Sequence, residues 1–238
     1  MTNKELVAKL KNIEKNYKTL YVMGCFGAPL NASNKTRYCS NHSYNKDKTR
    51  RNMIMSATAD TFGFDCVNLI KAVLWGWTGD KNKTYGGAQY NTNGVPDVSA
   101  DGMIAKCTNV STNFNNIEVG EAVWLPGHIG IYIGDGLAIE SSPAWKNGVQ
   151  ITACNCTKSG YNKRSWTKHG KLPYITYEKE KKKMLETGND IVWELMNGKH
   201  KIEILEANKA IKALDKAKNH PEFLSLYWII YKVVNGNG

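Results

Sequence analysis

The amino-acid sequence predicts an α+β fold, with helices packed on an antiparallel sheet, followed by a small helical appendage at the C-terminus. Residues 66–77 place apolar side chains on one face of a helix, whereas residues 121–140 consist of short β-rich runs separated by turn residues. After Tyr177 the composition changes to a charged run and then to strongly helical sequence. The chain has 238 residues and is 42% hydrophobic, which is typical of a packed globular protein.

The first half of the chain is predicted to contain an opening helix and two long irregular stretches. Apolar residues recur between residues 3 and 18 at intervals of three and four, which indicates an amphipathic helix. From Gly24 to Arg51 the sequence is rich in Asn, Ser, Lys and Tyr with little periodicity, and a second such region runs from Gly79 to about Asn116. Both regions are therefore predicted to be surface loops.

Strands are predicted in the second half of the chain. In residues 121–140, Pro126-Gly127 and the run 134–136 (Gly-Asp-Gly) interrupt β-rich sequence, which is typical of a hairpin. A further strand is expected over residues 148–153, and another over residues 174–177.

Residues 178–238 are predicted to be a helical appendage, joined through the charged run 178–183 to a domain formed by residues 1–177. Two stripes of apolar residues at helical spacing indicate its helices, and Pro221 lies where a first-turn proline belongs. The stripes are Ile202, Leu205, Ala210 and Leu214, then Phe223, Leu226, Ile230 and Val233.

The formal net charge of +11 implies an anionic partner, which is nucleic acid, a membrane surface or an anionic cell wall. The sequence contains no basic helix with interleaved aromatic residues and no nucleic-acid motif, so nucleic acid is disfavoured. No run of about 18 apolar residues is present, and no membrane span is expected. Residues 1–24 lack the apolar run of a secretory signal, so export by that route is not predicted.

The cysteines are too few and too irregularly spaced for a disulfide scaffold. One residue separates Cys154 from Cys156, whereas zinc knuckles have a two-residue gap. The sequence therefore predicts neither a metal site nor a cofactor. The other cysteines are Cys25, Cys39, Cys66 and Cys107.

Cys66 is the cysteine with a chemically suggestive position. Asp65 is a good N-cap residue, so Cys66 is expected in the first turn of a helix. Unpaired backbone N–H groups and the helix dipole there favour a thiolate, and the same N–H groups can bind an oxyanion. On this stretch alone, a buried core cysteine is the commoner interpretation.

A cysteine nucleophile needs a base, and His128 is the histidine with a fixed orientation because it begins a predicted strand. The other four histidines lie in predicted loops or at helix boundaries, where solvated or capping roles are expected. They are His42, His169, His200 and His220.

The predicted hairpin supplies a third residue. If residues 134–136 form a three-residue loop, Ile133 lies opposite Leu137 and the isoleucines share one apolar face. The other face then carries His128 and Glu140 as diagonal neighbours on adjacent strands, with about 7 to 8 Å between their backbone positions, a distance that a long side chain can cross. A carboxylate at this place would orient the imidazole and stabilise its protonated form. The combination favours a catalytic set of Cys66, His128 and Glu140.

These motifs resemble those of the NlpC family of cell-wall cysteine peptidases. Residues 64–66 (Phe-Asp-Cys) are similar to the family's "FDCSGL", and residues 120–142, GEAVWLPGHIGIYIGDGLAIESS, are similar to its hairpin "GDLVFxxGHVGIYIGNGxxIHAS". The upstream LYVMGCFG, residues 20–27, is similar to "PYxWGG". Three motifs occur in the family's order.

The resemblance implies a papain-like core and hydrolysis of stem-peptide bonds in bacterial peptidoglycan, commonly the γ-D-glutamyl to diamino-acid bond. It implies that Cys66 is the nucleophile, His128 the base and Glu140 the third polar residue. By the same match, Tyr21 lies near the oxyanion and Asp65 meets the amino end of the substrate. Neither a metal nor a cofactor is implied.

The chain departs from the family pattern at two places. Glu140 replaces a histidine, and Val67-Asn68 replaces Ser-Gly after the nucleophile. Two alternatives follow, a CHAP-type amidase or endopeptidase with the same Cys-His-carboxylate set, and a catalytically dead basic module that binds wall or nucleic acid. Without a secretory signal, a cell-wall enzyme is expected to stay in the cytoplasm until release, as a phage or prophage lysin does.

Overall fold

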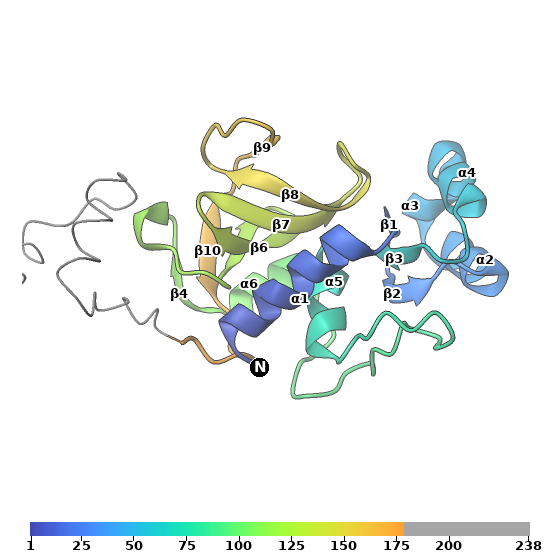
Figure 1. Ribbon diagram of the computed structural model, residues 1–238, viewed down its shortest axis with the longest axis horizontal. Helices are drawn as coiled ribbons and strands as arrows, with labels where there is room; N and C mark the ends of the chain where they lie inside the picture. The colour runs from blue at the N-terminus through green and yellow to red at the C-terminus, as the bar shows by residue number, and fades with distance from the viewer. Residues whose placement is uncertain (179–238) are drawn as a thin grey trace, which may run out of the picture. The chain divides into compact units, whose positions relative to one another are not determined.

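A curled seven-stranded sheet is the framework of the protein, seen in a computed structural model that describes residues 1–178 (Figure 1). The strand order is β4-β10-β5-β6-β7-β8-β9, and all neighbours are antiparallel except β8 and β9. This arrangement confirms the predicted α+β class. The strands are β4 (Thr108–Ser111), β5 (Ala122–Leu125), β6 (His128–Gly134), β7 (Leu137–Ser142), β8 (Gly148–Cys154), β9 (Lys163–Arg164) and β10 (Lys168–Lys171).

A second, three-stranded sheet has the order β1-β3-β2. Strands β1 (Thr19–Tyr21) and β3 (Phe62–Phe64) are parallel, and β2 (Phe26–Pro29) is antiparallel to β3. Strand β3 leads through Asp65 into helix α5 (Cys66–Leu74), so this small sheet fixes the point at which α5 begins.

Helix α1 (Asn3–Asn16) confirms the predicted opening helix and lies across one face of the large sheet, close to α5 (Figure 1). It begins with a capping box, in which the Thr2 hydroxyl accepts from the Glu5 N–H and the Glu5 carboxylate accepts from the Thr2 N–H. Its apolar stripe is buried in the same core as the strand isoleucines Ile129, Ile131, Ile133 and Ile139.

The prediction of irregular loops over 24–51 and 79–116 is wrong. Their helices are short and mostly polar, so few positions carry an apolar periodicity. Three of these helices, α2, α4 and α6, begin at side-chain caps supplied by Asn31, Asp47 and Ser99. The first region holds β2, α2 (Ala32–Asn41), α3 (Ser43–Lys46) and the start of α4 (Lys48–Ser56), and the second holds α6 (Ala100–Lys106), β4 and the 3-10 turn η1 (Phe114–Asn116).

The hairpin between β6 and β7 keeps its predicted apolar face but not its predicted loop. Ile131 lies opposite Ile139, as expected, whereas Leu137 pairs with Gly134 instead of Ile133. The register shifts at a bulge, where Gly134 has φ 93°, and Asp135 follows with φ 53°. The extra residue is absorbed at the turn, so the residues nearer the strand ends keep their predicted faces.

Strand β8 confirms the strand expected over residues 148–153, but the strand expected over 174–177 is absent. Thr176 makes only an isolated bridge to Thr2, and the preceding β10 takes the place beside β5. Among the helices of residues 1–178, none has the length and apolar character that crossing a bilayer requires. The helices predicted within 178–238 lie outside the described residues.

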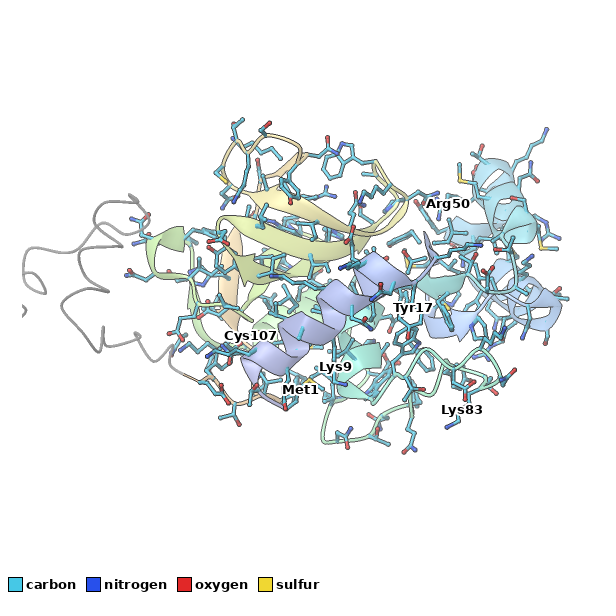
Figure 2. The ribbon with its side chains drawn as sticks, in the orientation of Figure 1. Met1, Lys9, Tyr17, Arg50, Lys83 and Cys107 are labelled. Carbon is cyan, nitrogen blue, oxygen red and sulfur yellow. The ribbon has the colours of Figure 1, made fainter. Side chains whose placement is uncertain are left out.

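Arg50 on α4 ties the small sheet to the large one. Its guanidinium donates to the carbonyl oxygen of Tyr21 on β1 and, at 2.5 Å, to Asn147 Oδ1 in the turn between β7 and β8. Figure 2 shows this side chain between α4 and that turn. The contact matters because Tyr21 belongs to the candidate site described next.

Candidate active site

Cys66 is the first residue of α5, and two hydrogen bonds fix its position. Asp65 Oδ1 accepts from the backbone N–H of Asn68 at 2.8 Å, which confirms Asp65 as the N-cap. Ser141 Oγ on β7 donates to the carbonyl oxygen of Phe64 at 2.9 Å. The start of the helix is thereby held against the strand that carries Glu140.

The sulfur of Cys66 is nearly buried, with 7% of the residue exposed, but it lines a cavity of about 570 Å³. Burial, followed by the charge of Asp65, raises the pKa of the thiol to about 12. The backbone N–H groups of Ile129, Val67 and Cys66 itself act in the opposite direction and are outweighed. The helix start therefore acts in the expected direction, but burial outweighs it and the thiol pKa is raised.

His128 and Glu140 make the contact that the hairpin pattern predicts. The distance from His128 Nε2 to Glu140 Oε2 is 2.5 Å, and Gly130 lies between their backbones, where an added Cβ would come 3.3 Å from Glu140 Cβ. Alternation along the two strands places both side chains on the same face of the sheet, opposite the isoleucine core.

Glu140 is completely buried and accepts from two further side chains. Thr152 Oγ1 donates to Oε1 at 2.8 Å, and Arg164 donates to both carboxylate oxygens, through Nε at 3.1 Å and Nη2 at 2.7 Å. Burial alone would raise the pKa of Glu140, but the hydrogen bonds from His128 and Arg164 outweigh it and hold this pKa below its usual value. Glu140 is thus a carboxylate at neutral pH.

The imidazole of His128 also stacks on Trp166. The two ring centroids are 5.4 Å apart and the planes differ by 8°. Arg164, Thr152 and Trp166 were not identified from the sequence, because Arg164 and Trp166 lie on β9 and the loop after it, and no local pattern connects that segment to the hairpin. The fold alone brings them to the site.

Cys66 and His128 are brought near each other by the backbone segments that carry them. Strand β6, which begins at His128, packs against α5, and the backbone N–H of Ile129 acts to lower the pKa of the Cys66 thiol. Gly127, the residue before His128, lines the same cavity as Cys66. Among residues 1–178 no hydrogen bond joins the sulfur to the ring. Because Glu140 occupies Nε2, Nδ1 is the ring nitrogen that is available to exchange a proton with the thiol.

Tyr21 and Asp65 line the cavity beside Cys66. Burial, with the charges of Cys66 and Asp65, raises the pKa of Tyr21 well above its ordinary value, so the phenol is a neutral hydrogen-bond donor. Burial also raises the pKa of Asp65. Asp65 Oδ2 already accepts from the Gly24 N–H at 2.8 Å and from Asn68 Nδ2 at 2.6 Å, so a substrate amine would compete with these donors.

The cavity contains residues that the sequence did not single out. Lys71, on α5, is buried and pairs with Asp97, and its Nζ donates to the carbonyl oxygen of Val98 at 2.9 Å. His42, at the boundary between α2 and α3, lines the cavity and packs on Gly24, where an added Cβ would come 2.0 Å from its Nε2. His169 was predicted to lie in a loop, but it is buried on β10 and pairs with Glu121 away from this cavity.

Because its pKa is raised to about 12, the Cys66 thiol is expected to react slowly with iodoacetamide at neutral pH. Its rate should rise about tenfold per pH unit up to about pH 11, since only the thiolate reacts. Mass spectrometry of the Cys66 peptide gives this rate, with denatured protein as the control for an ordinary thiol. A fast reaction that does not vary from pH 5 upward would instead reveal a resting thiolate.

The comparisons with known proteins are sparse. No protein-family model matches the chain, and no curated protein is similar to it. Among solved structures, NlpC1 from Trichomonas vaginalis is similar over 71% of this chain and 44% of that chain, with 12% identity and a TM-score of 0.36. The chain therefore spans less than half of that neighbour's length, and the case for function rests on the site itself.

Proposed function

We propose that this protein is a cysteine peptidase that hydrolyses stem-peptide bonds of bacterial peptidoglycan. One observation carries the proposal: a buried Glu140 bonds and orients His128 on β6, the strand that packs against α5, whose first residue Cys66 lines a cavity. Nucleophile, base and orienting carboxylate are the three parts that thiol catalysis needs. The cell-wall substrate is proposed from the three sequence motifs.

In the proposed reaction, His128 Nδ1 takes the proton from the Cys66 S–H as the sulfur attacks a stem-peptide carbonyl carbon. The oxyanion accepts from the Cys66 backbone N–H and from the Tyr21 hydroxyl. The protonated ring then gives its proton to the leaving amine, which departs with the C–N bond electrons. Water, deprotonated by the same nitrogen, hydrolyses the thioester and restores the thiol.

The raised pKa of the thiol fits this sequence of steps. A thiol that is protonated at rest requires a base at the moment of attack, and the bond from Glu140 stabilises the imidazolium that results. The bond proposed to be cut is the γ-D-glutamyl to diamino-acid bond, because the motif resemblance implies it. The positive charge of the chain would favour contact with anionic wall polymers. Release from the cytoplasm in the manner of a phage or prophage lysin stays a prediction from the sequence.

Digestion of purified peptidoglycan tests the proposal. The protein should release fragments whose masses and new free amino groups, identified by mass spectrometry, place the cut within the stem peptide. EDTA should leave the rate unchanged, because the proposed reaction uses no metal. Intact muropeptides after long incubation with folded protein would contradict the proposal.

A CHAP-type amidase is the second candidate, favoured by the observation that the third residue is a carboxylate, Glu140. The same digestion separates the two, because an amidase frees whole stem peptides from the glycan strand. A catalytically dead binding module would leave all bonds intact. If that module bound DNA, its affinity would fall steeply with added salt.

A further inference from the structure

Arg164 reaches His128 only through Glu140. Its Nη2 donates at 2.7 Å to Oε2, which is the same oxygen that meets His128 Nε2 at 2.5 Å. A second hydrogen bond, from Arg164 Nε to Glu140 Oε1 at 3.1 Å, makes the pair bidentate and fixes the plane of the carboxylate. The guanidinium therefore determines both the orientation and the electrostatic environment of the group that holds the imidazole.

We propose that Arg164 is a positioning residue that sets the pH at which His128 can accept the proton of Cys66, an inference that rests on the proposed function. A buried carboxylate with His128 as its only cationic partner would hold the ring protonated, and a protonated ring is not a base. Arg164 neutralises Glu140, so the carboxylate orients the ring without keeping a proton on it.

The direction of this effect does not depend on which group carries the proton. His128 Nε2 and Glu140 Oε2 share one short hydrogen bond, so a charge placed beside them acts on both groups. A fixed positive charge beside the pair lowers its affinity for a proton, whether the proton resides on the ring or on the carboxylate. Removing that charge must raise the affinity.

Two tryptophans pack against this contact, and one of them, Trp166, is buried. The guanidinium carbon of Arg164 lies over the Trp145 ring, 4.5 Å from the centroid of that ring. The Arg164 side chain is 19% exposed. Trp166 stacks on the imidazole of His128. Because burial reduces screening, the charge of Arg164 acts more strongly here than it would at an open surface.

Other charged groups face the pair less directly. Asp65 and Cys66 lie at the start of α5, which packs against β6, and on α6, Asp101 accepts from the Gly127 N–H at 2.9 Å. From β10, Lys168 lies over the ring of Trp124 on β5. None of these groups bonds to the Glu140 carboxylate, so the experiment varies Arg164 alone.

The kinetic test compares Arg164→Gln, which removes the charge, with Arg164→Lys, which keeps it. The acidic limb of the kcat/KM profile on peptidoglycan should move to higher pH by about one unit in Arg164→Gln and stay within about 0.3 unit of the parent in Arg164→Lys. At the alkaline plateau, Arg164→Gln should recover most of the parent rate. A lower plateau with an unmoved midpoint would mean a structural role and overturn the proposal.

A second readout does not require activity. The midpoint of the His128 ring signals in NMR, assigned with His128→Gln, should rise by about one pH unit in Arg164→Gln, which is about tenfold in proton affinity. If this midpoint moves while the parent protein leaves peptidoglycan intact, the electrostatic role of Arg164 stands and the proposed function fails. If the parent is active and the midpoint does not move, the inference is overturned.

A double variant keeps the test decisive if Arg164→Gln does not fold. The double variant Arg164→Gln with Glu140→Gln removes both charges of the ion pair. It therefore avoids the main cost of the single variants, which is one buried charge without its partner. Its His128 midpoint should lie above that of Glu140→Gln, in which Arg164 is uncompensated and repels a proton on the ring. Equal midpoints in the two variants would contradict the proposal.

Discussion

Replacing Cys66 by alanine is expected to abolish hydrolysis of purified peptidoglycan, with kcat/KM falling by at least about 10⁴-fold. The sulfur forms the covalent bond to the substrate in the proposed reaction, and no other thiol of the described residues lines the cavity. The rate is measured as release of soluble muropeptides, with mass spectrometry to exclude slow cutting at another bond.

The matched control is Cys156→Ala. Cys156 follows β8 and lies against the turn between β6 and β7, where its thiol donates to the carbonyl oxygen of Gly136 at 3.4 Å. It does not line the cavity. The Cys156→Ala variant should hydrolyse peptidoglycan at the same rate as the parent. Both variants should unfold within a few degrees of the parent, because removing one sulfur costs about 1 kcal/mol at most and shifts Tm by about 2 to 4 °C. Undiminished hydrolysis by Cys66→Ala would remove the basis of the proposed function.

Replacing Glu140 by glutamine is expected to reduce both activity and stability. An amide can still accept from the ring, but it cannot stabilise the imidazolium by charge, so kcat should fall by about 10²- to 10⁴-fold. The fully buried position leaves Arg164 without its carboxylate, at a cost of about 3 kcal/mol in the free energy of unfolding near neutral pH. Muropeptide release and urea unfolding measure the two effects separately.

The stability loss in Glu140→Gln should depend on pH in a defined direction. The folded-state pKa of Glu140 is lowered, so its contribution is fully present above the unfolded pKa of about 4.3 and is lost as the pH falls through the folded value. Urea midpoints of parent and variant should therefore differ most above about pH 5 and converge in more acidic solution. A constant difference down to pH 2 would show that Glu140 is not ionised in the folded protein.

A second buried histidine-carboxylate pair supplies the control for Glu140→Gln. Glu121, beside β5, bonds His169 Nδ1 on β10, and His169 Nε2 contacts the carbonyl oxygen of Asn113 at 2.9 Å. Neither residue lines the cavity. Glu121→Gln should therefore leave kcat per folded molecule unchanged, whatever its effect on stability. Equal losses of activity in the two variants would show that the effect of Glu140→Gln is structural.

Short-range patterns were sufficient to predict the hairpin pair of the site. Alternation along residues 128–140 requires the isoleucines to face the core, and this requirement puts His128 and Glu140 on one face. The bulge at Gly134 changed the loop without changing that face. The N-cap at Asp65 was equally predictable, because a cap acts within a single helical turn.

Patterns failed where structure depends on contacts between distant segments. The polar helices α2 and α4 bury few side chains, so no stripe marks them, and they depend on caps and on partners such as Asn147. The raised pKa of Cys66 could not be predicted for a related reason. The helix start is local, but the burial that outweighs it comes from the packing of α5 against β6 and β7.

The sequence by itself determined the opening helix, the strand faces, the N-capped cysteine and the pairing of His128 with Glu140, because each depends on residues within a helical turn or one hairpin. Only the tertiary structure placed Arg164 and Trp166 around that pair, buried the Cys66 sulfur at a cavity wall and brought His42 and Lys71 to the same cavity. Those placements result from packing among elements far apart in the chain, which no local periodicity encodes.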